Sequence, residues 1–420
     1  MRASLFLDSI WSKVEHDLGD RFSSRRRLVT IITLGMLTGL GPLTIDLYLP
    51  AFPSLKLDLG IDDPQVQLTL SATIVGFSLG QLLIGPVSDR FGRRAPLLAM
   101  TALHVVSSVL VALAPNVTLL TMLRAIQGLA AAGGAVVAMA MARDLFSGRR
   151  LVKMLSRLAL ISGLAPILAP LLGSWLVVVL NWRGIFWVLA VYGALIVLLV
   201  GTLIQETRPV QDRPARGTGQ LKAAYHRVLT DSTFVGVALT AAFAFAGLFS
   251  YVSSSSVLFQ ETYRLSAQQF GLVFATGSIG IFVGLQLASR MATRYGPQWT
   301  LVAGTGLMLF ASLALLAINH VTASAWPLIP GIFTYTLGFG ASMPNCQVIG
   351  LQNHRRDSGT AASLMGSLNM AMAAIVGPVI GAFELVSAAP MAVSMLICAT
   401  ASTTALWLIV KPHRVRIDFD

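Results

Sequence analysis

The chain has few charged residues and almost no cysteine. Asp, Glu, Lys and Arg together make up 11% of its 420 residues, and Cys346 and Cys398 are its two cysteines. These cysteines fall in different apolar segments without a partner at zinc-ligand spacing, so we expect neither a disulfide framework nor a metal site. P-loop, HExxH, GxSxG and CxxC motifs are also absent, so we expect no catalytic site, no cofactor and no enzyme activity.

What the chain has instead is a series of long apolar segments. Hydrophobic residues make up 55% of the sequence, and the mean hydropathy is +0.74. This composition is not that of a water-soluble globule. Because the segments lack the short alternation of a membrane β-barrel, their backbone groups must be paired within helices. We predict an all-α integral membrane protein with twelve spans, at residues 28–50, 66–87, 95–114, 118–146, 151–179, 183–204, 232–259, 267–289, 299–319, 325–349, 358–383 and 387–410.

The basic residues predict the orientation. If both termini are cytoplasmic, nearly all Lys and Arg residues fall on the cytoplasmic side, and only Lys56, Arg183 and Arg264 fall on the opposite side. This is the positive-inside bias of membrane proteins. The net charge of +12 therefore does not indicate nucleic-acid binding, because these charges are dispersed over short loops rather than gathered on one face with stacking aromatics.

The longest charged interruption, Gln205 to Asp231, divides the spans six and six. It is rich in Pro and Gly, and Leu221, Tyr225, Val228 and Leu229 share one helical face in it, which indicates a surface helix or, as the alternative, a mobile tether. The N-terminal segment has a similar apolar face, with a frayed tail as the alternative. We predict a cytoplasmic N-terminal segment (1–27), an N-terminal six-helix bundle (28–204), a cytoplasmic linker (205–231), a C-terminal six-helix bundle (232–410) and a cytoplasmic tail (411–420).

The two halves of the chain look related. Residues 80–92 align without gaps on residues 284–296, and residues 169–173 align on residues 377–381 at a similar offset. A parallel duplication of this kind is typical of transporters built from two helical bundles.

Several motifs resemble the major facilitator superfamily and, within it, the twelve-span drug:proton antiporters. The stretch Gly85 to Arg94 (GPVSDRFGRR) resembles the loop signature after the second helix, and Arg124 to Gly134 is similar to the fourth-helix signature. Gly163 to Gly173 resembles the fifth-helix antiporter signature, although Ala169 and Ser174 replace glycines often found there.

Two further stretches, 42–53 and 182–187, resemble the bicyclomycin and chloramphenicol resistance (Bcr/CflA) subfamily. The resemblance covers nearly the whole chain. It implies the major facilitator fold, in which two pseudo-symmetric six-helix bundles enclose a central cavity.

The resemblance also implies a gate latch. Asp89 would cap the start of the eleventh helix at Ser358 to Thr360, where unpaired amides and the positive dipole end favour a carboxylate. Arg93 would pair with Asp144. Such contacts would hold the cytoplasmic gate shut while the cavity faces outward and would break when it opens inward. The alternative is that these charges only anchor the topology. The predicted latch consists of Gly85, Asp89, Arg90, Gly92, Arg93, Arg94 and Asp144. The antiporter helix motif, whose residues permit close packing or bending, consists of Gly163, Pro166, Pro170 and Gly173.

Asp46 and Arg124 are charged residues placed inside predicted spans. A charge at mid-membrane costs about 2.5–3.5 kcal/mol on insertion scales, so such a residue normally faces a cavity and has a function. We predict that Asp46 exchanges a proton for substrate, and that Arg124 sets its electrostatics from the same cavity wall. A satisfied buried ion pair and an Asp46 exposed at the outer helix end are the alternatives. We expect His104, in the third span, to lie near lipid or to pack against a neighbour.

An amphipathic ligand requires aromatic and Met side chains with a few polar groups to orient it. Residues of these types lie on spans that line the central cavity in this superfamily. The predicted cavity residues are Tyr48, Met139, Phe243, Phe245, Phe249, Tyr251, Asn345, Gln347 and Asn369.

We therefore expect a monomeric, proton-coupled antiporter in a bacterial inner or plasma membrane that exports drug-like amphipathic compounds, chloramphenicol or bicyclomycin among them. Its partners would be the substrate, protons and membrane lipid. The alternatives are proton-linked export of a small metabolite such as a sugar or amino-acid derivative, uptake, and, more remotely, a non-transporting receptor or a membrane enzyme.

Overall fold

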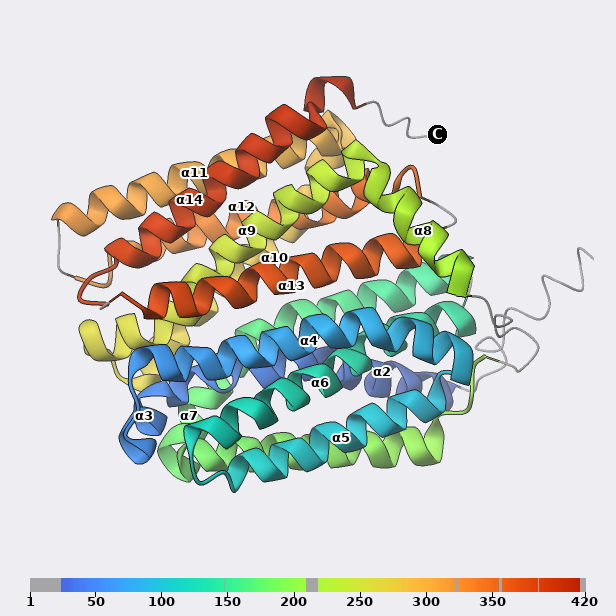
Figure 1. Ribbon diagram of the computed structural model, residues 1–420, viewed down its shortest axis with the longest axis horizontal. Helices are drawn as coiled ribbons and strands as arrows, with labels where there is room; N and C mark the ends of the chain where they lie inside the picture. The colour runs from blue at the N-terminus through green and yellow to red at the C-terminus, as the bar shows by residue number, and fades with distance from the viewer. Residues whose placement is uncertain are drawn as a thin grey trace, which may run out of the picture.

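The computed structural model describes residues 24–146, 148–208, 218–321, 324–354, 357–383 and 385–415. Long helices run side by side through this part of the chain, with α3 (Phe52–Leu59) at one end of the molecule and α8 (Thr218–Thr230) at the other (Figure 1). We call these the α3 end and the α8 end. The surface helix expected in the N-terminal segment lies outside the described residues.

The first half of the chain forms one group of helices. Its members are α2 (Ser24–Asp46), η2 (Leu49–Ala51), α3, α4 (Asp63–Phe91), α5 (Arg94–Ala112), α6 (Val117–Leu145) and α7 (Gly148–Leu203). The predicted first span continues past Asp46 through η2 and α3. The long α7 is broken at Asn181, whose φ of 58° and ψ of −174° are not helical. The chain therefore crosses twice within α7, as predicted for spans five and six.

The second half forms another group, connected by α8. Its members are α9 (Ser232–Ser256), the π-helix η4 (Val257–Thr262), α10 (Ala267–Tyr295), α11 (Pro297–Val321), α12 (Leu328–Leu351), α13 (Ser358–Gly381), α14 (Ala389–Ala405), the π-helix η5 (Leu406–Val410) and η6 (Pro412–Arg414). In the linker, α8 buries Val228 and leaves Leu229 exposed, so its packed face is narrower than predicted.

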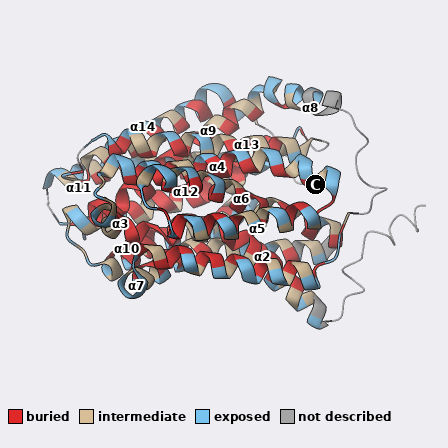
Figure 2. Ribbon diagram, turned by 60° about the horizontal axis from the view of Figure 1, so that its bottom comes forward, coloured by how far each residue is buried: buried red, intermediate tan, exposed pale blue. Residues whose placement is uncertain are grey.

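The number of spans matches the prediction. Ten stretches of the described residues are long and apolar enough to cross a membrane, and one of them contains both arms of α7. The remaining helix, α12, has 24 residues and is about 36 Å long, which also suffices. Figure 2 shows the buried residues on the inward faces of the helices. Large apolar side chains on the outside, such as Trp175, Val191 and Phe310, are 65–69% exposed, as expected for a surface that faces lipid.

The helices α4 and α10 support the duplication inferred from the sequence. Each begins with a capping box, Asp62 with Gln65 in α4 and Ser266 with Gln269 in α10. Each ends at a glycine with positive φ, 91° at Gly92 and 87° at Gly296. The same devices therefore start and stop the second helix of each half.

Glycines bring helix backbones into contact within each group. A Cβ added to Gly128 of α6 would collide with the carbonyl oxygen of Thr73 of α4. In the second group, a Cβ on Gly340 of α12 would collide with the carbonyl oxygen of Ile281 of α10. Because hydrocarbon does not drive apolar helices together, such close approach is a main source of helix association in membranes.

We predict that Gly128→Ala destabilises the protein by about 1–3 kcal/mol, the usual range for overpacking, because two helix backbones must move apart. Gly306→Ala, which adds a methyl group where no atom lies within 4 Å, is the matched control. Thermal unfolding of the detergent-solubilised protein measures both, and equal midpoints would contradict the prediction.

Candidate transport site

The two helix groups meet along two antiparallel helix pairs. In the pair α4–α13, the Ser78 hydroxyl donates to the Ser367 carbonyl (2.9 Å), and a Cβ on Gly377 would lie 2.6 Å from Ser71 Oγ. In the pair α7–α10, the Ser278 hydroxyl donates to the Pro166 carbonyl (2.9 Å). These contacts along the two helix pairs are made by small polar side chains and glycines.

The antiporter helix motif lies on α7 where it packs against neighbouring helices. A Cβ on Gly163 would approach Phe282 of α10 to 3.3 Å, and Gly271 of α10 packs next to the Pro170 carbonyl. Gly173 instead packs on the backbone of Leu47, in the segment that follows α2. These residues therefore act as contact points between helices, as their types suggested.

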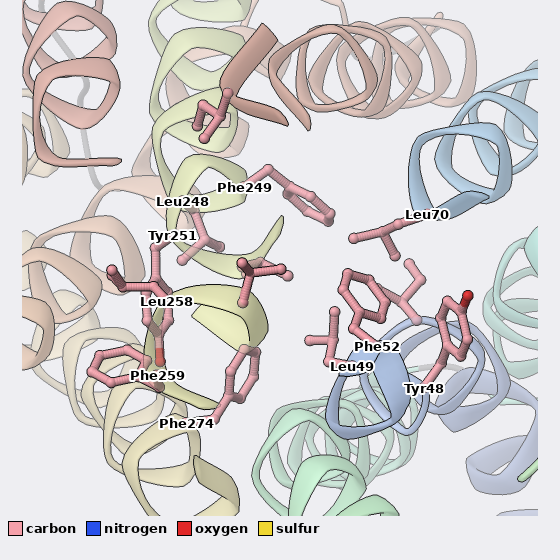
Figure 3. Close-up of a cluster of buried hydrophobic side chains, with 14 of the residues drawn as sticks. Tyr48, Leu49, Phe52, Leu70, Leu248, Phe249, Tyr251, Leu258, Phe259 and Phe274 are labelled. Atoms are coloured by element: carbon pink, nitrogen blue, oxygen red, sulfur yellow. The ribbon is translucent and has the colours of Figure 1, made fainter. Parts of the chain in front are cut away.

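At the α3 end the two groups are joined by an apolar cluster. Figure 3 shows Leu49, Phe52 and Leu70 from the first half facing Phe249 from the second. Hydrogen bonds reinforce it, since the Ser256 hydroxyl donates to the Leu49 carbonyl (2.6 Å). This end of the interface is closed.

An ion-pair bridge lies beside this cluster. Lys56 of α3 pairs with Asp63 of α4 and, across the interface, with Glu261 of η4 at 2.6 Å. Because the Lys56 side chain is only 17% exposed, solvent and salt screen this bridge less than they screen a fully exposed ion pair. Sequence reasoning missed this bridge, because it identified Lys56 only as a basic residue on the non-cytoplasmic side.

At the α8 end, part of the predicted latch is present. Arg93 pairs with Asp144 (Nε to Oδ2, 2.9 Å), as predicted, and also with Asp89 (2.7 Å). Gly92 has a positive φ, and Arg94 donates to the Gly201 carbonyl of α7. Arg90 lies over the neighbouring Phe91 ring at 5.2 Å. Around Gly85 there is open space.

The predicted contact between Asp89 and the start of α13 is not formed in this structure. Asp89 pairs with Arg93 and with Arg208, which follows α7, and not with the start of α13. Asp357, the N-cap residue of α13, instead binds Arg227 of α8 through both oxygens (2.9 and 3.0 Å).

Glu206 completes the cluster at the α8 end and was also missed. Burial by itself would raise the pKa of Glu206, but the backbone N–H groups of Arg93, Arg94, Thr207 and Arg208 donate to its carboxylate and hold that pKa below its ordinary value. It ties the start of the linker to the loop between α4 and α5. The position of Glu206 directly after the predicted sixth span could have indicated a role at this end of the bundle.

Asp46 and Arg124 do not share a cavity wall, which corrects the prediction. Arg124 contacts α2 and the turn after it through Thr44 and Tyr48, whereas successive residues of a helix are separated by about 100°. Asp46, two residues from Thr44, therefore points to the other side of α2. It is 8% exposed and lies within electrostatic range of Tyr251 on α9.

Arg124 lies at the centre of a polar cluster inside the first helix group. Its Nη1 donates to the Thr44 carbonyl (3.1 Å) and to Gln127 Oε1 (2.6 Å). The guanidinium lies over the rings of Tyr48 (4.7 Å) and Phe186 (5.4 Å), which stabilises a buried cation. His104 bonds Thr44 Oγ1 (2.9 Å) from the same cluster, so it is packed against neighbours and does not face lipid.

The Asp46 carboxylate has a different environment. Within the described ranges, neither an ion pair nor a hydrogen bond connects it to another residue. The Tyr251 hydroxyl, buried on the opposite helix group, is likewise without a hydrogen-bond partner in the described part of the chain. The alternatives of a satisfied ion pair and of an acid exposed at the helix end therefore do not describe Asp46.

The predicted cavity residues fall into distinct environments. Tyr48, Phe249 and Tyr251 are buried in the cluster that joins the two groups, and Phe245 stacks on Phe249 at 5.3 Å. Phe243 is a correction, because it lines a groove between α9 and α14 on the outer surface. Met139 packs on the core of the first group, and Asn345 donates a hydrogen bond within its own helix (2.8 Å). Gln347 is exposed. Asn369 has a buried amide oxygen that no described residue binds.

Gln67 was not predicted. Both polar atoms of its amide are buried and have no partner among the described residues, and Gly381 of α13 packs next to it. A buried, unsatisfied amide at the contact between two helix groups is costly unless a ligand, water or another state satisfies it. The position of this polar side chain inside a predicted span could have marked Gln67 as a candidate site residue.

Two related groups of membrane-spanning helices that meet along two helix pairs define a multi-pass transporter. The chain belongs to the major facilitator superfamily, whose sequence profile, described as Major Facilitator Superfamily, matches residues 34–378. The relatives that follow support the resemblance to bicyclomycin and multidrug resistance proteins of this superfamily.

The chain is similar to an uncharacterized MFS-type transporter of Bacillus subtilis, YdgK, at 34% identity over 93% of this chain and 97% of the relative. It is also similar to a bicyclomycin resistance protein homolog of Haemophilus influenzae (29%; 91% and 96%) and to the multidrug resistance protein MdtL of Escherichia coli (28%; 89% and 93%). These relatives are transporters and not enzymes.

A solved structure has the same fold. It is a bacterial homolog of the human lysosomal transporter Spinster in an inward-facing, unoccupied conformation, with a TM-score of 0.67 and 15% identity over 93% of this chain and 96% of that one. At this identity the match concerns the fold alone.

We predict that Lys56→Gln opens the α3 end, because it removes the ionic bridge between the two groups. Spin labels at Leu57→Cys and Val386→Cys, both exposed at this end, report the distance by double electron–electron resonance, while the buried Cys346 and Cys398 stay unlabelled. The longer-distance population should grow. Arg183→Gln, which breaks an ion pair with Asp58 inside the first group, is the control, and an equal response would contradict the prediction.

We predict that Glu206→Gln lowers thermal stability at neutral pH, and that the difference from the native protein disappears in acid. A carboxylate with a depressed pKa stabilises the fold above its ordinary pKa of 4.5, and this contribution is lost as the pH falls through the lower, folded-state value. Unfolding midpoints between pH 7 and pH 3 measure it. A pH-independent difference would show that the charge of Glu206 is irrelevant.

Proposed function

We propose that this chain is a proton-coupled antiporter of a bacterial inner membrane that exports amphipathic, drug-like compounds, and that Asp46 carries the proton. The observation that carries this proposal is the environment of Asp46. An acid inside a membrane span, buried where the two helix groups meet and without a described cation beside it, is the expected state of a group that binds and releases a proton. The names of the relatives support the class of substrate.

The orientation follows from the ends of the molecule. Arg90, Arg93, Arg94 and Arg208 lie at the α8 end, with Lys411 and Arg414 beyond η5, whereas Lys56 and Arg183 lie at the α3 end. Under the positive-inside rule, this distribution supports a cytoplasmic α8 end. In this proposal the closed α3 end lies on the side of the membrane opposite the cytoplasm.

Transport then requires the helix groups to rock about their interface. The Lys56–Glu261 bridge and the cluster around Phe249 would separate as the α3 end opens. At the α8 end, Asp89 would leave Arg208 as the loop approaches α13. The small residues along α4–α13 and α7–α10 permit this movement because they interlock little.

Asp46 would couple this movement to protons. Protonation of Asp46 on one side of the membrane removes a charge from the interface. Substrate binding on the other side then favours release of the proton from Asp46. Each proton that moves inward contributes about 2.3 kcal/mol per 100 mV, which supports about a 50-fold concentration gradient of a neutral substrate for each proton exchanged. In this proposal Arg124 is a positioning residue, since it holds the Thr44 carbonyl two residues before Asp46.

We expect Asp46→Asn to lose proton-driven transport while the protein still folds. Proteoliposomes loaded with acidic buffer and diluted into alkaline buffer should accumulate labelled chloramphenicol or bicyclomycin with the native protein. The rate should fall at least about tenfold with Asp46→Asn, because the amide cannot exchange a proton at these pH values. Asp58→Asn, which removes a surface acid at the α3 end, should behave like the native protein.

Two outcomes would overturn the proposal. Full gradient-driven uptake by Asp46→Asn would remove Asp46 as the coupling residue. In cells, overexpression that gives no drug protection but changes the release of a sugar or amino-acid derivative would point to metabolite export.

A further inference from the structure

A groove runs along the outer surface between α9 and α14, outside the interface of the two helix groups. Its walls include Leu239 and Phe243 from α9 and Ile397, Ala401 and Thr404 from α14, and it extends to Ile409 of η5. Ile397 is 63% exposed and Ile409 is 39% exposed, so the groove opens toward the membrane. Nothing in the transport proposal uses it.

The packing of the two helices determines the shape of this groove. The Ser402 hydroxyl donates to the Thr240 carbonyl (2.8 Å) and holds α14 on α9. Close contacts lie above and below, since a Cβ on Gly236 would be 2.8 Å from Ile409 and one on Gly247 would be 3.1 Å from Cys398. Between these points, small residues such as Ala401 leave a channel that larger side chains border.

The groove has the length and position of one lipid leaflet. Twelve residues separate Ile397 from Ile409, which corresponds to about 18 Å along a helix. The hydrocarbon core of a bilayer is about 30 Å thick, so this length is close to one half of it. The groove ends at the α8 end of the molecule, where α14 and η5 leave the membrane-spanning region.

Cationic side chains stand where the groove ends. Lys411, two residues after Ile409, has a left-handed backbone (φ 55°), at which the chain turns away from the π-helix η5 into η6. Lys411, His413 and Arg414 are exposed. The chain has no acidic residue between positions 385 and 415, and Asp418 and Asp420 follow in the sequence.

We propose that this groove is a binding site for an anionic phospholipid such as phosphatidylglycerol. One acyl chain lies in the apolar channel against Phe243 and Ala401, and the phosphate lies at Lys411 and Arg414. The combination of an apolar, leaflet-long channel with cations at its polar end matches a lipid and not a soluble ligand or a peptide. A neutral phospholipid would fit the channel but would gain less from the cations.

Native mass spectrometry of the purified full-length protein tests the site, with palmitoyl-oleoyl phosphatidylglycerol and the matching phosphatidylcholine as probes. We expect one phosphatidylglycerol to bind about tenfold or more tightly than phosphatidylcholine. Ala401→Trp, which fills the channel, should weaken both lipids. Lys411→Ala with Arg414→Ala should reduce the preference to about onefold without removing the channel.

Matched controls keep the test decisive. Leu195→Trp adds the same ring to an exposed position on α7, and Arg290→Ala removes an exposed cation from the α8 end of α10. Neither should change the binding. Equal affinity of the native protein for both lipids, equal losses in the controls, or a dimer that forms in place of the lipid complex would each overturn the proposal. If Ala401→Trp misfolds, the double variant Lys411→Ala with Arg414→Ala still tests the proposal, because it leaves the helix packing intact.

Discussion

Backbone contact between helices is the constraint on which this structure depends. Lipid does not drive apolar helices together, so α4 with α6 and α10 with α12 associate where Gly128 and Gly340 let one backbone touch the other. The same geometry in both halves explains why the duplication survives as structure while the sequences of the halves have diverged. The rigid groups so formed can move relative to each other without losing their own packing.

The interface between the groups is built differently. It has small residues along α4–α13 and α7–α10, apolar closure and one ionic bridge at the α3 end, and charged clusters at the α8 end that remain mostly within one half. Strong contacts are therefore inside each group, and weaker, separable ones lie between them. This distribution suits a protein that must alternate between two arrangements.

Buried polar groups follow the same division. The Arg124 cluster is inside the first group, where Thr44, Gln127 and two aromatic rings surround the cation in a fixed arrangement. Asp46, Gln67 and Tyr251 lie at the contact between the groups and have fewer described partners. Arg124 Nε and Nη2 also lack a hydrogen-bond partner among the described residues, so the two sets differ in whether they lie inside one group or between the groups.

The sequence by itself determined the membrane class, the twelve spans and the duplication, because hydropathy, caps and motif spacing are local properties. The Arg93–Asp144 pair was implied by the family resemblance. Only the tertiary structure decided that Asp46 and Arg124 point away from each other, since the direction of a side chain depends on a rotation of about 100° per residue and on which helices surround it. The same holds for Asp89, whose partner is Arg208 from a distant segment. Folding also placed Phe243 outside, because in a chain that is apolar on all sides hydrophobicity does not separate the lipid-facing surface from the interior.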